Sequence, residues 1–419
     1  MWFTRSVVDR AWKSSDGQSA VGVRSDGLTG PAPLSAGAAW LLRMLRDRVP
    51  RTRSEIADVT GLARSTVAQR VDALLNSQLV GPAGEARSTG GRPPARFAFN
   101  PSARIVLSAD LGATHAHVAI TDLSASVLVE HREDIEIAHG PEKLLALVAE
   151  QGHRLISAAG RDVSDLAGIG VGLPGPVEHA TGRPVSPPIM PGWDGYDVPG
   201  FLESEFGRVT VVDNDVNIMA LGEHFSVYPD VDNLVFVKVA TGIGSGIIID
   251  GALRRGTQGA AGDLGHLNVP HDEKAVCHCG NVGCLEAVAS GDAIAAKLRE
   301  KGIDAHTSSD VVRLARSGST ETTTLVREAG RTIGEVLASV VSLLNPSVIV
   351  IGGPLADAGE GLLAGVREVV YRRSLPLATN HLRIVPAQVG RRAAVVGAAV
   401  EVIDHVLAPE QIGTLLSPS

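Results

Sequence analysis

Residues 262–286 read GDLGHLNVPHDEKAVCHCGNVGCLE and hold all three cysteines of this 419-residue chain: Cys277, Cys279 and Cys284. The glycines of the Cys-x-Cys-Gly-x-x-Gly-Cys segment let the backbone bend tightly, because glycine lacks a Cβ. Three thiolates and one imidazole form the closed tetrahedral set that a structural zinc ion uses. The spacing therefore predicts structural Zn²⁺ bound by the three cysteines, with three free thiols in a loop as the alternative.

The fourth ligand is a histidine of the same stretch, and the spacing leaves His266, His271 and His278 all open. The pattern Gly-Asp-x-Gly-His, followed by Cys-x-Cys-Gly-x-x-Gly-Cys-x-Glu, resembles the signature of the ROK family (repressors, open reading frames, sugar kinases). The resemblance implies that His266 is the fourth zinc ligand, and that Asp263, His266 and Glu286 line a sugar pocket. The family usually has Glu where this chain has Asp263, so the identity of the ligand is left open.

A second side of the implied pocket begins where the strand pattern VTVVD, residues 209–213, ends in Asn214-Asp215 and a helix pattern starts. Carboxylates that follow strand ends face clefts in α/β folds. The resemblance implies that Asn214 and Asp215 bind the sugar. It also implies that Asp215 is the catalytic base, accepting the proton of a sugar hydroxyl, if the protein is a kinase. A plain helix cap is the alternative.

Two strand–Gly turn–strand units, about 130 residues apart, predict two related α/β lobes. Their turns resemble the phosphate-binding motifs of the sugar-kinase, actin and heat-shock ATPase superfamily, and a later strand resembles its adenosine-side motif. The resemblance implies ATP-binding positions at Asp110, Gly112, Thr114, Thr241, Gly242, Gly244, Gly352 and Gly353. Ala113 and Ala240 stand where those motifs have glycine, and a methyl group there hinders a phosphate that approaches the backbone. These two residues count against ATP and Mg²⁺ as cofactors.

The segment PPIMPGW, residues 187–193, resembles a family segment that usually reads Pro-Asn-Leu-x-Gly-Trp. In the family this Asn contacts a sugar hydroxyl, whereas Ile189 can neither donate nor accept a hydrogen bond. Together with Asp263, Ile189 predicts a ligand that carries an apolar or acylated substituent, or a pocket that has lost sugar binding.

Residues 35–100 are basic, with ten arginines, no lysine and five acidic residues, although the whole chain has a net charge of −8. A basic segment on an acidic body indicates a nucleic-acid module, and an ordinary Arg-rich surface is the alternative. A short helix with Ser54 as its candidate N-cap, a turn at Gly61 and an amphipathic helix from Arg64 describe a helix-turn-helix. A helical hairpin of another kind would have the same pattern.

Arginines around the following Gly-Gly turn predict a basic wing, and the order of elements resembles the winged N-terminal domain of ROK repressors. Base readout is expected from the first turns of the second helix, and phosphate contacts from arginines. The predicted DNA contacts are Arg64, Ser65, Thr66, Gln69 and Arg70 on that helix, and Arg87 and Arg92 in the wing.

These patterns predict an α/β protein in which a winged helix-turn-helix precedes a two-lobed actin/sugar-kinase-like domain, a duplicated ribonuclease H-like fold. Residues 1–34 form a flexible leader, 35–100 the winged domain and 101–419 the ROK body. The lobes span about 101–217 and 218–395, and the C-terminal helix packs back on the first lobe. Few cysteines in a metal-like motif and the lack of a long apolar run favour a cytoplasmic protein that does not enter a membrane.

The resemblance implies a sugar-responsive transcriptional regulator, a repressor, that binds operator DNA and senses a sugar or sugar derivative between its lobes. Operators are usually palindromic, so a homodimer or homotetramer is expected. The rival hypothesis is an ATP-dependent sugar kinase with an added DNA-binding domain. A third is a DNA-binding ROK-like protein without a small-molecule effector.

Overall fold

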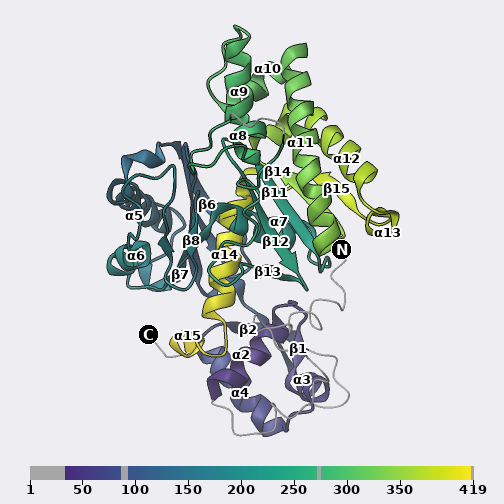
Figure 1. Cartoon of the computed structure of the whole chain (residues 1–419). Helices are drawn as coiled ribbons and strands as arrows, with labels where there is room; N and C mark the ends of the chain where they lie inside the picture. The colour runs from purple at the N-terminus through teal and green to yellow at the C-terminus, as the bar shows by residue number, and fades with distance from the viewer. Residues whose placement is uncertain (1–33, 86–92, 271–274, 417–419) are drawn as a thin grey trace.

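Three parts make up the protein, and the computed structural model describes residues 34–85, 93–270 and 275–416 of it. Figure 1 shows a small N-terminal domain at the bottom of the view and two α/β lobes above it. The helix α14 (Ala393–Val406) lies centrally and runs down toward the small domain. Among these described residues, no helix is both long enough and apolar enough to cross a membrane.

The N-terminal domain, here called the winged domain, consists of helices α2 (Leu34–Leu45), α3 (Arg53–Thr60) and α4 (Arg64–Asn76) and strands β1 (Arg51–Thr52), β2 (Val80–Glu85) and β3 (Ala95–Phe99). The strands pair antiparallel in the order β1-β3-β2. Gly61 ends α3 in the left-handed conformation, at φ 68°, which confirms the predicted turn before α4. The structure therefore has the predicted three-helix unit with a small sheet.

The predicted N-cap at Ser54 is wrong, because the N-cap of α3 is Thr52, two residues earlier. The Thr52 hydroxyl accepts a hydrogen bond from Glu55 N, and the Glu55 carboxylate accepts one from Thr52 N. This reciprocal pair satisfies two backbone donors that Ser54 would leave open, so Thr-x-x-Glu fixes the start of the helix.

Each lobe is built on a five-stranded sheet with the same connectivity. The first sheet has the order β10-β7-β4-β5-β6 and the second β13-β12-β11-β14-β15. The first contains β4 (Ile105–Leu111), β5 (His115–Asp122), β6 (Val127–Asp134), β7 (Leu166–Leu173) and β10 (Thr210–Asn214). The second contains β11 (Leu234–Val239), β12 (Ile243–Ile249), β13 (Ala252–Arg254), β14 (Val348–Gly352) and β15 (Arg383–Pro386). In both, three antiparallel strands are followed by two parallel ones, which confirms the predicted duplicated fold.

Helices cover these sheets and connect their strands. In the first lobe they are α5 (Pro141–Ala158) and α6 (Val198–Phe206), beside a short hairpin of β8 (Val177–Glu178) and β9 (Arg183–Pro184). α7 (Asp215–Val227) follows β10 and packs against β12 of the second lobe. The second lobe carries α8 (Leu285–Ala289), α9 (Gly291–Glu300), α10 (Ser308–Arg316), α11 (Thr320–Leu344), α12 (Gly361–Arg373) and α13 (Pro376–Thr379). The chain ends with α14 and α15 (Gly413–Leu416).

Helix α14 packs against β4 and β7 of the first lobe and, most extensively, against α7. Gly222 on α7 and Gly397 on α14 allow this close approach. A Cβ at Gly397 would lie 1.7 Å from the Ile218 carbonyl oxygen, and one at Gly222 would lie 1.9 Å from that of Ala393. Because both neighbouring atoms belong to the backbone, any larger residue at Gly222 or Gly397 would force the two helices apart.

The far end of α14 belongs to the core of the winged domain. One cluster of buried side chains contains residues of α2 and α4, such as Leu41 and Val71, together with Ile403, Val406 and Leu407 at the end of α14. Arg46 also donates to Asp404 at 2.8 Å. The winged domain is therefore packed onto α14 and is not attached only through a linker.

Candidate functional site

The cysteine-rich stretch folds into one cluster. His266 Nδ1 lies 3.5 Å from Cys277 Sγ, and the sulfurs of Cys279 and Cys284 lie 3.7 Å apart. All four donor atoms lie within 4.8 Å of one another. His278 is exposed and is not in this cluster, and His271 lies outside the described residues. The structure thus brings together the four ligands that the family resemblance selects.

These donors fit a tetrahedral zinc ion. With zinc–sulfur bonds of about 2.3 Å, sulfurs at two corners of a tetrahedron are about 3.8 Å apart. The sulfurs of Cys279 and Cys284 lie 3.7 Å apart, close to this distance. Cys277 and Cys284 are buried, and burial together with the neighbouring thiols raises the pKa of Cys284 to about 12. A bound dication would stabilise the thiolates that burial disfavours. Three thiols and one imidazole leave no position for a reacting water.

The cysteine–histidine cluster lies next to the predicted sugar-binding residues. His266 Nε2, the nitrogen that points away from the sulfurs, lies 4.0 Å from Asp263 Oδ1. Glu286 Oε2 accepts a hydrogen bond from Ile243 N at 3.0 Å, and Glu286 Oε1 lies 4.0 Å from Cys277 Sγ. The cluster therefore fixes Glu286 against the Gly-rich turn between β11 and β12.

Asn214 serves as the N-cap of α7, the alternative that the sequence left open. Its Oδ1 accepts from Val216 N at 3.0 Å, and its Nδ2 donates to Gly175 O at 2.9 Å. Because both ends of the amide are bonded to the backbone, at most one N–H of Asn214 is free to meet a ligand. Sugar binding by Asn214 stays a prediction.

Asp215 is buried at the start of α7 and has a partner that the sequence did not reveal. Lys238 Nζ, from β11 of the second lobe, donates to Asp215 Oδ2 at 2.5 Å. Burial raises the pKa of Asp215, and the nearby Lys238 ammonium opposes this rise. Only the pairing of the lobes brings these two side chains together, since Asp215 follows the last strand of the first sheet and Lys238 lies on β11 of the second.

The first Gly-rich turn is filled by a second unpredicted residue. His115 Nε2 lies 3.1 Å from Asp110 Oδ2, and its ring occupies the space above Gly112, where a Cβ would lie 2.2 Å from the ring. Burial opposes ionisation of Asp110, yet its hydrogen bond to His115 and the charges of His115 and Lys238 hold its pKa below the usual value.

The other predicted ATP-site glycines also lie directly against other atoms of the protein. A Cβ at Gly242 would lie 2.2 Å from Glu286 Oε2, and one at Gly352 would lie 2.4 Å from the ring of Phe236. Gly353 has φ +84° and lies against the backbone of Val239. A Cβ at Gly244 would touch Val216, whereas Thr241 is half-buried and Thr114 is exposed. Internal packing thus accounts for these glycines, and their role toward ATP stays a prediction.

A charged cluster joins the two lobes behind the predicted ligand residues. Arg255, after β13, donates to Asp213 Oδ2 at 2.6 Å and to Glu401 Oε1 at 2.5 Å. Asp213 directly precedes Asn214, Glu401 lies on α14, and His179 Nδ1 lies 3.8 Å from Glu401. The histidine and the two carboxylates have the spacing of a metal site, but the Arg255 guanidinium already supplies a cation. One guanidinium faces two carboxylates, and burial followed by the charge of Asp213 raises the pKa of Glu401 to about 8.

We expect Glu401 to make the stability of the protein depend on pH. Its pKa in the folded state lies above the ordinary value of 4.5, so the folded protein keeps a proton that the unfolded chain releases. The stability due to this proton is complete below pH 4.5 and is lost as the pH rises through about 8. In urea unfolding between pH 5 and about 8.5, Glu401→Gln should lose less stability than the wild type as the pH rises. An unchanged slope in the variant would contradict this assignment.

The winged domain presents most of the predicted DNA contacts of α4 on its surface. Arg64, Ser65 and Gln69 are exposed, and Thr66 is half-buried. Arg87 and Arg92 lie outside the described residues. The first turns of α4 therefore form an open polar face that carries one positive charge.

Arg70 does not lie on this face, contrary to the sequence prediction. It is buried, with 6% of its surface exposed. Its guanidinium lies over Gly37 of α2, where a Cβ would come within 2.3 Å of Arg70 Nε. The helical repeat places Arg70 next to Val67 and Val71 on the packed side of α4, so we no longer count it among the DNA contacts.

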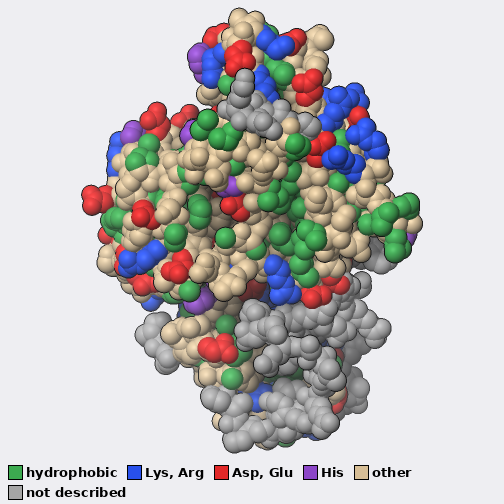
Figure 2. Space-filling model, in the orientation of Figure 1, with side chains coloured by type: hydrophobic (Ala, Val, Ile, Leu, Met, Phe, Trp, Pro, Cys, Tyr) green, Lys and Arg blue, Asp and Glu red, His purple; other side chains and the backbone are tan. Residues whose placement is uncertain are grey.

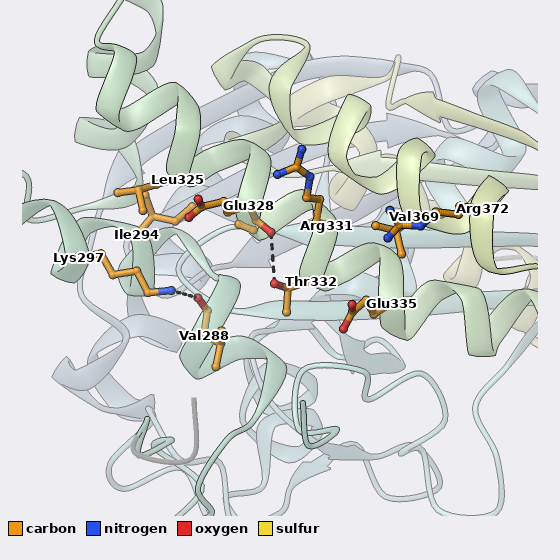
Figure 3. Close-up of a pocket in the computed structure, with 11 residues that line it drawn as sticks. Val288, Ile294, Lys297, Leu325, Glu328, Arg331, Thr332, Glu335, Val369 and Arg372 are labelled. Atoms are coloured by element: carbon orange, nitrogen blue, oxygen red, sulfur yellow. Dashed lines mark hydrogen bonds between the residues drawn. The ribbon is translucent and has the colours of Figure 1, made fainter. Parts of the chain in front are cut away.

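A hollow of about 360 Å³ lies between the helices of the second lobe and is lined in part by Lys297, Arg331, Glu335 and Arg372. Figure 3 shows these side chains coming from α9, α11 and α12. In Figure 2, lysine and arginine side chains gather over α11 and α12 at the upper right. Several of these charges are paired, as in Arg331 with Glu368 at 3.2 Å. None of the predicted site residues lines this hollow, so we assign it no function.

Comparison with known proteins agrees with this architecture. A "Putative xylose repressor" of Caldicellulosiruptor sp. (strain Rt8B.4) is 30% identical over 382 residues, covering 88% of this chain and 95% of that protein. A glucokinase of Halalkalibacterium halodurans is 30% identical over 312 residues but covers only 71% of this chain. A crystal structure of a ROK family transcriptional regulator, a homologue of the E. coli Mlc protein, has a TM-score of 0.78 at 25% identity and covers 91% of this chain and 98% of its own. The model of the ROK family matches residues 106–405, and the chain therefore belongs to the ROK family.

Proposed function

We propose that this protein is a sugar-responsive transcriptional regulator, a repressor, that binds operator DNA as a symmetric homo-oligomer. The observation that carries the proposal is that the winged domain shares its core with α14. α14 in turn packs against α7, whose first residue is Asp215. A change at the predicted ligand site can therefore reach the DNA-binding domain through two packed helices.

Operator binding is assigned to the exposed face of α4. Arg64 and Gln69 come from its first two turns, which is the part of a recognition helix that meets base edges and phosphates. The repressor names of the relatives that cover the winged domain support this assignment. A symmetric operator would be bound by two such domains, one from each protomer.

Effector binding is assigned to the region where the lobes meet. Asp215 and Asn214 come from the first lobe, and Asp263, His266 and Glu286 from the stretch beside β12. Zinc, bound by His266 and the three cysteines, would hold this second group in place. These carboxylate, imidazole and amide groups range from buried Asp215 to exposed Asp263 and suit the hydroxyls of a sugar or sugar derivative.

The charged cluster of Asp213, Arg255 and Glu401 gives this effector site a second connection to α14. Arg255 of the second lobe is bonded both to Asp213 of the first lobe and to Glu401 of α14, and Asp213 directly precedes the predicted ligand residue Asn214. If the effector changes the angle between the lobes, Arg255 must follow one lobe and Glu401 the other. The position of α14, and with it that of the winged domain, would then depend on the effector.

A sugar kinase is the less favoured function. The glucokinase relative covers the body but not the whole chain, and a regulator needs no phosphate site. Lys238 is bonded to the would-be base Asp215, and the glycines expected to receive phosphates are occupied by internal contacts. A base already held in an ion pair is poorly placed to accept a substrate proton.

The proposal is tested with the full-length protein and a duplex selected from random sequences by binding. D-xylose, D-glucose and N-acetylglucosamine are then titrated with and without MgATP. We expect one of these sugars, without nucleotide, to change the apparent operator affinity by about 5- to 150-fold, the usual range of allosteric coupling. The absence of sequence-specific DNA binding would refute the proposal. ATP-dependent sugar phosphorylation at about 1 s⁻¹ or faster, abolished by Asp215→Asn, would establish the kinase instead.

A further inference from the structure

A single buried ammonium group lies among the carboxylates between the lobes. Lys238 is on β11 in the centre of the second sheet, and its side chain is 19% exposed. Asp215 at the start of α7 and Asp110 on β4 are 7% and 9% exposed at their side chains. Lys238 donates to Asp215 at 2.5 Å, and its charge also acts on Asp110. The lysine comes from one lobe and both acids come from the boundary of the other.

A cation beside these acids is electrostatically favourable. The negative charge of Asp110 contributes to the raised pKa of Asp215, and the Lys238 ammonium opposes this rise. Two like charges in a poorly solvated site repel by several kcal/mol at separations of about 4–6 Å. The cation beside Asp110 and Asp215 can be a metal dication or a protonated side chain, but the two cannot occupy the same place at once.

We propose that Lys238 is a built-in cation that takes the place of the divalent metal between Asp110 and Asp215, so that the cleft responds to its effector without a nucleotide. This inference rests on the proposed function in one respect, the assignment of the cleft as the effector site. Lys238 is then a positioning residue: it holds Asp215 by an ion pair and ties the two lobes together. The residues present do not fit the Mg²⁺-ATP that related kinases need.

One oxygen of each acid already has a side-chain partner, which supports this assignment. Asp110 Oδ2 is engaged by His115, which also fills the space above Gly112. Asp215 Oδ2 is engaged by Lys238. A metal ion that entered here would have to displace the hydrogen bonds of His115 and Lys238. It would also be repelled by the Lys238 ammonium, which lies within salt-bridge distance of Asp215. Mg²⁺ also requires near-ideal octahedral oxygen ligation, which this arrangement does not offer.

Removal of the Lys238 charge should create a metal site, an effect that a merely structural ion pair would not produce. We would compare zinc-loaded full-length wild type, Lys238→Met and Lys238→Arg for binding of Mn²⁺ by electron paramagnetic resonance. Mn²⁺ serves as the probe because it prefers carboxylate oxygens to the thiolates of the zinc site. We expect Lys238→Met to bind one additional Mn²⁺ at least about tenfold more tightly than wild type, a difference of about 1.4 kcal/mol. Lys238→Arg keeps the charge and should behave as the wild type.

The acids can be tested as the metal ligands in the same experiment. Asp215→Asn added to Lys238→Met should abolish the new Mn²⁺ site. Lys238→Gln, which keeps a hydrogen-bond donor but has no charge, replaces Lys238→Met if the latter does not fold, as judged by circular dichroism. The proposal would be overturned if the wild type bound Mn²⁺ as tightly as both uncharged variants. It would also be overturned if neither folded variant bound Mn²⁺. Operator binding and its response to sugar are measured separately on the wild type, so a failure of the proposed function would be recognised independently.

Discussion

Cys284→Ser is expected to abolish the binding of zinc and to lower the stability of the protein by about 4–5 kcal/mol or more, the range reached when a metal site is lost. Cys284 is buried, with 1% of its surface exposed, and its sulfur lies 3.7 Å from that of Cys279. It also directly precedes α8 and Glu286. Without zinc, the 262–286 stretch would lose the cross-link that holds Glu286 against the β11–β12 turn.

Zinc content and thermal unfolding measure this effect. The midpoint of unfolding should fall by about 10 °C, since each kcal/mol shifts it by about 2–4 °C in a domain of 150–250 residues. The response of operator binding to sugar should weaken as well. His278→Ala is the matched control, because His278 is exposed in the same loop and is not in the cluster. It should keep one zinc per chain and an unchanged midpoint. A Cys284→Ser protein with one zinc per chain and wild-type stability would contradict the assignment.

The second large effect is expected on α4. Gln69 is exposed at the second turn of the helix, and Gln69→Ala should reduce discrimination between operator and mutated operator by about 5- to 150-fold, the equivalent of about 1–3 kcal/mol for a base contact. Arg64→Ala should weaken binding to all sequences and reduce the salt dependence of binding by about one counterion. The two substitutions thus separate base readout from phosphate contact.

Binding is measured by fluorescence anisotropy at several salt concentrations. Arg372→Ala is a suitable control, because it removes an exposed arginine of the body and should leave DNA binding unchanged. Equal effects of Arg64→Ala and Arg372→Ala would show that α4 does not contact the operator. Deletion of residues 1–100 is a poorer test, since it would expose the apolar end of α14, including Ile403 and Val406. The isolated body would then lose stability for reasons unrelated to DNA.

The sequence predicted well those features that depend on neighbours along the chain. The three cysteines lie within eight residues, and glycines between them allow one tight turn, so few arrangements of the cluster were possible. Strand patterns that alternate with Gly turns likewise predicted the antiparallel part of both sheets, because β4, β5 and β6, and likewise β11, β12 and β13, pair with the next strand in the chain. The resemblance to the ROK family supplied His266, which spacing alone did not distinguish from His271 and His278.

Side chains that meet across the fold were not predictable in this way. The charge of Arg70 suggested a surface residue, although the helical repeat places it on the packed side of α4, and the structure shows that its guanidinium is covered by Gly37 of α2. Asn214 could equally be a ligand residue or a cap. The structure shows that its Oδ1 accepts from Val216 N to cap α7, and that its Nδ2 is bonded to the distant Gly175 O. Neither the local sequence pattern nor the composition indicates how far apart two separate segments lie in the folded chain.

The sequence by itself determined the cysteine cluster, the duplicated strand–turn–strand units and the helix-turn-helix pattern, because short-range spacing and hydrophobic periodicity fix each of them. Only the tertiary structure decided that Lys238 pairs with Asp215, that Arg255 pairs with Glu401, and that the winged domain shares its core with α14. Lys238 and Asp215 belong to different lobes, and Arg255 and Glu401 are 146 residues apart. Such contacts depend on how whole lobes pack, and packing is a property of the folded chain rather than of any one segment of it.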